Sequence, residues 1–149
     1  MPELRFYHLQ KRSVEQALPL IVSKAYKTEK NIIIRIGETG NISDLDDELW
    51  GFDPASFLPH VVEGGKNPEL NPIYLTKSND NPNDAKILFL VSGASADDIS
   101  GYDLVCMVFN GNDDLELKEA RLKWKQYKDS DFKLAYWQQS DSGAWENKA

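Results

Sequence analysis

Residues 31–36 read NIIIRI, and this short stretch decides the fold of the chain. Four of its six residues are isoleucine, and a β-branched run of this kind is typical of a strand buried on both faces, as in a parallel sheet. Gly37 and Gly40 follow directly and predict a turn. We therefore expect a buried strand that ends at Ile36.

Helical patterns flank this strand along the chain. Ser13 and Gln16 match a capping box. They mark the start of a helix expected at about residues 14–27, in which Pro19 predicts a kink or a later start. After the strand, residues 41–50 carry apolar side chains at helical spacing and predict a second, short helix.

The rest of the chain continues this alternation. A last long helix is expected at residues 114–128, capped by Asp113 and Glu116. The alternation predicts a single three-layer α/β domain of Rossmann-like outline, with a mostly parallel sheet and helices on both faces. We place this domain at residues 1–138 and a flexible tail at residues 139–149. The other strands are expected at residues 4–9, 73–76, 86–91, 102–109 and 132–138.

Composition and charge exclude several classes of protein. The chain has 149 residues, with 17 basic and 24 acidic side chains and a formal net charge of −7. That balance argues against a broad nucleic-acid footprint, because duplex binders present a basic face to many phosphates. No apolar run approaches the roughly 20 residues of a membrane span, and the N-terminus lacks a signal-peptide pattern. The single cysteine, Cys106, fits a reducing compartment, so we expect a cytoplasmic protein.

No motif predicts catalysis, a cofactor or a metal. The glycine-containing turns at residues 37–41, 63–66 and 92–95 lack both the P-loop ending and the dinucleotide fingerprint. His8, His60 and Cys106 show no metal-ligand spacing, and nothing positions a Cys–His dyad. Cys106 lies in an apolar stretch that is typical of a buried structural thiol.

The last helix stands out because it is basic within an acidic chain. Residues 118–128, KEARLKWKQYK, hold five basic and one acidic side chain. Two stripes, about 100° apart, run along this helix. Two interpretations remain open: a solvated helix end above a core stripe, or a site for an anionic hydrophobic peptide. The basic stripe is Lys118, Arg121, Lys125 and Lys128, and the apolar one is Leu117, Ala120, Trp124 and Tyr127.

Trp50 is a second unusual residue. It ends the helix expected at residues 41–50 and lies outside the apolar stripe of that helix. It either covers the edge of the core or walls a binding pocket, and the sequence leaves both readings open. The Gly- and Pro-rich residues 52–72 follow, and segments of this kind inside compact domains tend to be functional or to carry an interface.

Two blocks of this sequence resemble the chi subunits of the bacterial DNA polymerase III holoenzyme, which are clamp-loader accessory proteins. The first block is residues 47–50 (DELW) followed by residues 56–60 (SFLPH), similar to the family's acid-x-LW and SF-x-PH patterns. The second is residues 121–127 (RLKWKQY), similar to R-x-R-Y-K-x-Y on the family's last helix. The opening strand, with Phe6 and Tyr7, also resembles the family's first strand.

The resemblance implies a Rossmann-like adaptor without nucleotide chemistry. Family members bind the acidic C-terminal tail of single-stranded DNA-binding protein, which ends in Pro-Phe with a free carboxylate. They also bind the psi subunit, which links chi to the clamp loader. Carried over by position, Arg121 meets the tail carboxylate, and Trp50 and Trp124 line the pocket. The implied tail-binding set is Trp50, Phe109, Asn110, Lys118, Arg121, Trp124 and Lys125. The implied surface for psi, or alternatively for a repair helicase, is Phe57, Leu58, Pro59 and His60.

The sequence departs from the family pattern at two places on the last helix. Leu117 stands where the family can carry a lysine, and Lys118 substitutes from the next position. Trp124 replaces a tyrosine, which keeps the aromatic face and loses the hydroxyl. Two other functions are weighed against the adaptor: a small α/β enzyme or nucleotide binder that uses the carboxyl edge of the sheet, and a protein that binds single-stranded DNA directly through Trp124 and the lysines.

Overall fold

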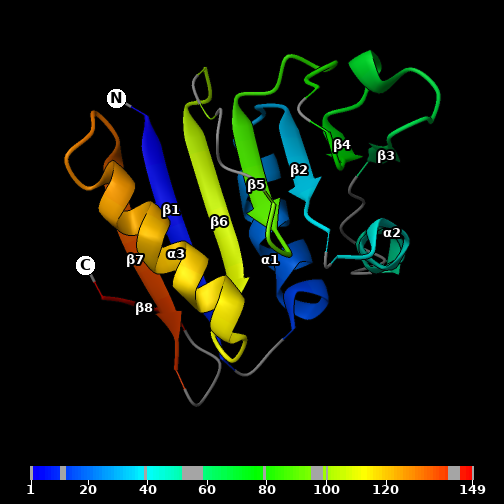
Figure 1. The fold of residues 1–149 in the computed structure, drawn as a ribbon. Coiled ribbons are helices and arrows are strands. Elements are labelled where there is room, and N and C mark those ends of the chain that lie inside the picture. Colours follow the sequence, from blue (N-terminus) through cyan, green and yellow to red (C-terminus); the bar gives the residue numbers. More distant parts are fainter. Residues whose placement is uncertain are drawn as a thin grey trace.

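A single mixed sheet runs through the molecule (Figure 1). The computed structural model describes residues 2–10, 13–38, 40–51, 59–78, 80–94, 99, 101–140 and 145–148. Within these residues the sheet has eight strands in the order β3-β4-β2-β5-β6-β1-β7-β8, all parallel except the antiparallel pair β7 and β8. The strands are β1 (Glu3–Leu9), β2 (Ile32–Ile36), β3 (His60–Val62), β4 (Ile73–Thr76), β5 (Ile87–Val91), β6 (Leu104–Asn110), β7 (Lys133–Gln139) and β8 (Trp145–Asn147).

Helices lie on both faces of this sheet, which confirms the predicted three-layer α/β fold. The helices α1 (Val14–Tyr26) and α2 (Ile42–Gly51) cover one face, and α3 (Asp114–Tyr127) covers the other (Figure 1). A short 3-10 helix, η1 (Pro68–Leu70), precedes β4. Every residue of β2 is buried, as the isoleucine run predicts. Its side chains alternate, so that Ile32 and Ile34 pack with α1 while Ile33 packs in the α3 layer.

The handedness of the connections explains which helix lies on which face. The connections through α1 and α2 both move along the sheet toward β3, whereas the connection through α3 moves from β6 to β7, in the opposite direction. Crossovers between parallel strands are right-handed in nearly all proteins. Two right-handed crossovers that move in opposite directions place their helices on opposite faces, so the strand order separates α2 from α3.

Local signals set the ends of the helices. Ser13 and Gln16 form the predicted capping box, with each side chain accepting a hydrogen bond from the other residue's backbone N–H. The helix α1 therefore starts at Val14 and not after Pro19, which lies buried within it. Asp113 caps α3, because its carboxylate accepts from the backbone N–H groups of Leu115 and Glu116.

Short strands are the main difference from the sequence expectations. β3 and η1 lie in the Gly- and Pro-rich segment of residues 52–72, and β7 pairs with a further strand, β8, that the sequence did not predict. Part of the expected tail is thereby strand: Gln139 closes β7 and is buried, and the ring of Trp145 in β8 meets Tyr7 edge-on at 5.3 Å. Three-residue strands carry too few side chains to show a period of two.

Candidate functional site

The two stripes predicted on α3 face in different directions. Ala120 is buried, and Leu117, Trp124 and Tyr127 pack against the core beneath the helix. Lys118, Arg121 and Lys125 are exposed on its outer side. The core interpretation therefore holds for the aromatic stripe, while the basic stripe is free to meet a ligand.

Trp124 is held in place by other aromatic rings. Its ring lies edge-on to Phe6 of β1, at a centroid distance of 5.3 Å, and edge-on to Tyr136 of β7 at 5.7 Å. Edge-to-face pairs of this kind add stability beyond the area that they bury. Trp124 stays half-buried, so it presents part of its ring at the surface beside the basic stripe.

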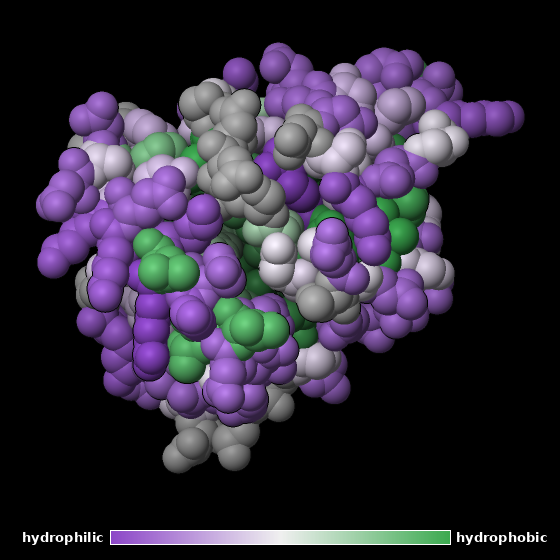
Figure 2. Space-filling model, viewed as in Figure 1, coloured by the Kyte–Doolittle hydropathy of each residue, from purple (hydrophilic) through white to green (hydrophobic). Residues whose placement is uncertain are grey.

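A shallow groove runs along the exposed side of α3 and combines cationic with apolar groups. Among the described residues, its lining includes Arg121, Lys118 and Lys125 together with the aliphatic side chain of Leu122, and Asp114 lies at one end. Leu122 is 49 % exposed and Leu115, near the start of the helix, is 75 % exposed. Figure 2 shows separate hydrophobic patches within the hydrophilic surface over this helix. A ligand with both a negative charge and an apolar group matches this surface.

His8 and Tyr136 extend the site beneath Arg121, and the sequence did not point to either. His8 Nδ1 lies 2.7 Å from the Tyr136 hydroxyl oxygen, and the His8 ring packs 5.1 Å from the ring of Phe109. Burial, and then the charge of Arg121, lower the pKa of His8 from its usual 6.5. Burial raises the pKa of Tyr136, while the charge of Arg121 opposes that change. The Arg121 guanidinium therefore acts on both groups. The register of β1 and β6 pairs His8 with Phe109. The contact between their rings therefore follows from strand pairing, and the linear sequence does not indicate it.

Phe109 and Asn110 lie at the carboxyl end of β6, next to this pair. Phe109 is only 1 % exposed, so it supports the His8 ring from below and offers little surface to a ligand. Asn110 is half-buried, and its side-chain oxygen accepts from the backbone N–H of Asn112 at 2.9 Å, which holds the turn before α3.

Trp50 lies in a different place. It is 53 % exposed at the end of α2, and its ring lies 4.2 Å from the ring of His60 in β3. His60 Nε2 in turn lies 2.8 Å from Asp46 Oδ1 of the same helix. Four strand spacings separate β3 from β6, about 19 Å in a typical sheet, and α2 and α3 cover opposite faces.

The structure therefore does not bring Trp50 together with Trp124. It groups Trp50 with His60 and the neighbouring Pro59, which belong to the other predicted surface. Phe57 and Leu58 of that surface lie outside the described residues. The resemblance to the family implies one pocket for both tryptophans, and the helical patterns of the sequence carry no information on which face of the sheet each helix covers.

Cys106 is the single cysteine of the chain, and its thiol offers no reactive group at the surface. Cys106 is buried as predicted, and burial raises the pKa of its thiol to about 12. In the part of the chain that the structure describes, no group of three or more His, Cys, Asp or Glu side chains is placed to hold a metal ion. None of the helices described there has the length and apolarity to cross a membrane.

Comparison with known proteins agrees with the two sequence blocks. Residues 1–135 match the model of the family described as DNA polymerase III chi subunit, HolC. The chain is also similar to the "Probable DNA polymerase III subunit chi" of Rickettsia prowazekii (strain Madrid E). The two are 25 % identical over 150 residues, which cover 97 % of this chain and 91 % of the relative.

Proposed function

The chain belongs to the chi-subunit family of DNA polymerase III, and on that premise we propose that it is a non-catalytic replication adaptor in the bacterial cytoplasm. In this proposal the surface of α3 binds the acidic C-terminal tail of single-stranded DNA-binding protein. The surface around Trp50 and His60 joins the psi subunit of the clamp loader, or alternatively a repair helicase. The protein meets DNA only through the protein that coats it.

The observation that carries the tail proposal is the exposed Arg121 between two further cations and an exposed leucine. A guanidinium offers a fork of donors that fits a carboxylate, and Lys118 and Lys125 lie one turn away on either side. The aliphatic surface of Leu122 and the exposed part of Trp124 lie beside this charge. A peptide that ends in an aromatic residue brings its free carboxylate and its ring to the same place, which this surface accommodates.

Direct binding of single-stranded DNA through Trp124 is less well supported. Proteins that bind single strands stack bases on open aromatic faces. Trp124 is half-buried against Phe6 and Tyr136, so it offers a base only part of its surface. The net charge of −7 also repels a polyanion.

The proposed tail site is tested with a fluorescent acidic peptide that ends in Pro-Phe with a free carboxylate. We expect saturable binding that weakens with salt. Arg121→Ala removes a charge-assisted hydrogen-bonding partner, worth about 1.5–3 kcal/mol, which corresponds to binding weaker by about tenfold to a hundredfold. Lys123→Ala is the matched control, because it removes one positive charge from the same helix about 200° around from Arg121. Equal binding by Arg121→Ala and the unmodified chain would show that this site assignment is wrong.

A further inference from the structure

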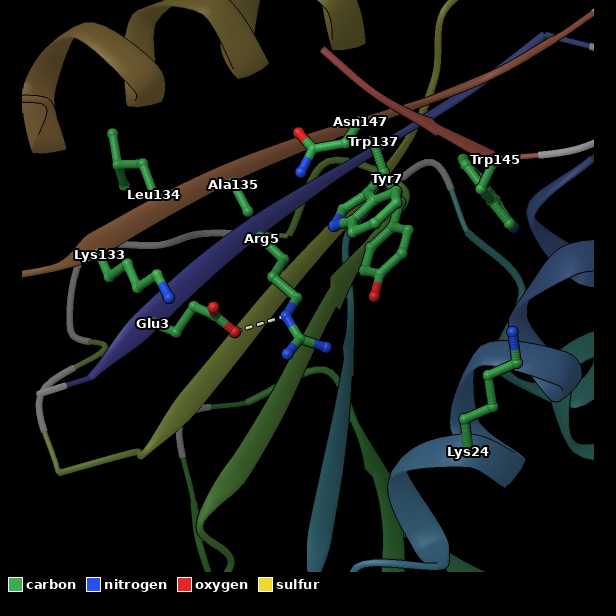
Figure 3. Close-up of a pocket in the computed structure, with 10 residues that line it drawn as sticks. All are labelled: Glu3, Arg5, Tyr7, Lys24, Lys133, Leu134, Ala135, Trp137, Trp145 and Asn147. Atoms are coloured by element: carbon green, nitrogen blue, oxygen red, sulfur yellow. Dashed lines mark hydrogen bonds and ion pairs between the residues drawn. The ribbon is translucent and has the colours of Figure 1, made fainter. Parts of the chain in front are cut away.

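A second cationic and aromatic surface lies on the face of the sheet opposite α3. There α1 covers the middle of the sheet, and described residues of α1, β1, β7 and β8 line a groove beside it. We name this space the α1–β8 groove. Figure 3 shows Arg5 and Tyr7 of β1, Lys24 of α1 and the two tryptophans Trp137 and Trp145 around it. None of these residues belongs to the surfaces discussed above.

The groove is positive although the chain is negative. Arg5, Lys24 and Lys133 contribute three positive charges and Glu3 one negative charge, a local balance of +2. The Glu3 carboxylate pairs with Nε of Arg5, which fixes the guanidinium in the groove (Figure 3). Lys24 and Lys133 are exposed and come from different elements, one on each side of Arg5. This arrangement favours a short anionic ligand.

The other end of the groove is more apolar, although Arg5, Tyr7 and Lys24 also line it. It continues past Tyr7 and Trp145 to the side chains of Phe89 and Leu104 and the thiol of Cys106. Thr28, a further polar group at this end, already donates its hydroxyl hydrogen to the Ala25 carbonyl at 2.6 Å. Ile21, Phe89 and Leu104 at this end offer a nucleobase no hydrogen-bonding partner, and donors or acceptors buried against them are costly. An apolar peptide side chain has no such groups and fits this end better.

The backbone beside the groove is open to pairing. β8 pairs with residues 137–139 of β7, and Lys148 donates its N–H to the Tyr136 carbonyl. Among the described residues no strand pairs with the first part of β7 on that side. Lys133 donates its N–H to Pro2 toward β1, so by alternation the backbone groups of Leu134 point to the open side. An extended segment gains backbone hydrogen bonds at such an edge.

We propose that the α1–β8 groove binds an extended, acidic polypeptide segment with an apolar side chain, as a docking site separate from the α3 surface. The carboxylates of the segment pair with Lys24, Lys133 and the guanidinium of Arg5. Its apolar side chain enters beside Trp145, and its backbone meets the open edge of β7. The site allows the adaptor to hold two acidic partners at once, on opposite faces of the sheet.

The four tryptophans of the chain make this proposal testable, because they mark three different places. Trp124 marks the α3 surface, Trp50 the His60 surface, and Trp137 and Trp145 the groove. The probe is the peptide Asp-Glu-Phe-Asp-Glu with both ends blocked, which lacks the free terminal carboxylate that the α3 surface is proposed to bind. In ¹⁵N-labelled full-length protein, we expect the peptide to shift the indole resonances of Trp137 and Trp145 and to leave those of Trp50 and Trp124 in place.

Charge variants complete the test. The double variant Lys24→Gln with Lys133→Gln should weaken peptide binding about tenfold, whereas Lys27→Gln, an exposed lysine that does not line the groove, should change it less than twofold. Arg121→Ala should leave this binding unchanged, which separates the result from that for the α3 tail site. The proposal is overturned if millimolar peptide shifts neither Trp137 nor Trp145, or if only Trp124 moves. It is also overturned if an oligothymidylate of eight nucleotides shifts the indole resonances of Trp137 and Trp145 at a lower concentration than the peptide does, because the groove would then be a nucleic-acid site.

Discussion

Trp124 and Trp50 illustrate two ways in which a tryptophan can lie near a protein surface. Trp124 lies under α3 with two edge-on aromatic partners and is half-buried. Trp50 lies at the end of α2 with more than half of its surface exposed and contacts the ring of His60. Trp124 is thus part of the core beneath α3, whereas Trp50 contributes most of its side chain to the surface. Large exposed aromatic residues of the second kind are typical anchors of protein interfaces.

Removing each indole is the strongest test of this comparison. We expect Trp124→Ala to lower the free energy of unfolding by about 2–4 kcal/mol, because it leaves a gap between α3 and the sheet. Trp50→Ala should cost about 1 kcal/mol, since it loses mainly one aromatic contact. Urea denaturation of both variants measures the difference. Similar losses of stability would show that the two side chains are buried to a similar degree in solution.

Binding separates the two tryptophans further. Trp50→Ala should leave the affinity for the Pro-Phe tail peptide within about twofold, because Trp50 and Arg121 lie on opposite faces of the sheet. The same variant should weaken capture of psi or of a repair helicase if the surface around His60 is used as proposed. A large loss of tail affinity in Trp50→Ala would mean that one pocket joins both tryptophans after all.

The polar partners of His60 and His8 give a smaller effect. The side chain of His60 is fully buried and lies 2.8 Å from Asp46 Oδ1, so Asp46→Ala removes a partner of a buried polar group and should cost about 1–2 kcal/mol. Asp47→Ala is the matched control, because this neighbouring carboxylate on the same helix is exposed. Tyr136→Phe removes the hydroxyl beside the more exposed His8 and should cost about 1 kcal/mol. Thermal or urea unfolding ranks the three variants.

Local signals explain why most of the fold was predictable. The isoleucine run of β2, the capping box of α1 and the Asp113 cap of α3 each act within a few residues, and each gave the correct element. β3 and β8 were missed because strands of three residues are fixed by their neighbours in the sheet and not by their own pattern.

The candidate site was predictable only in part, for a related reason. Helical spacing is enough to place Arg121 and the lysines on one exposed stripe. The face of the sheet that a helix covers depends on strand order, which is a long-range property. Helical spacing therefore could not test the shared pocket that the family resemblance implies for Trp50 and Trp124. For the same reason the sequence gave no sign of His8 and Tyr136, which come together through the pairing of β1 with β7.

The titration of His8 provides the finest test of the α3 surface. Burial disfavours the charged form of the His8 ring, and protonation also places a positive charge near Arg121, so the pKa of His8 in the folded chain is below 6.5. The unfolded chain therefore binds this proton more readily, and the stability linked to His8 is present above pH 6.5 and is lost as the pH falls through the folded pKa. In Arg121→Ala the repulsion is gone, so the midpoint of the His8 ring resonance should move upward and this loss should shrink. Lys123→Ala should leave the midpoint in place. An unchanged midpoint in Arg121→Ala would show that the guanidinium does not lie close to His8. The carboxylate-binding geometry proposed for α3 would then need a different cation at its centre.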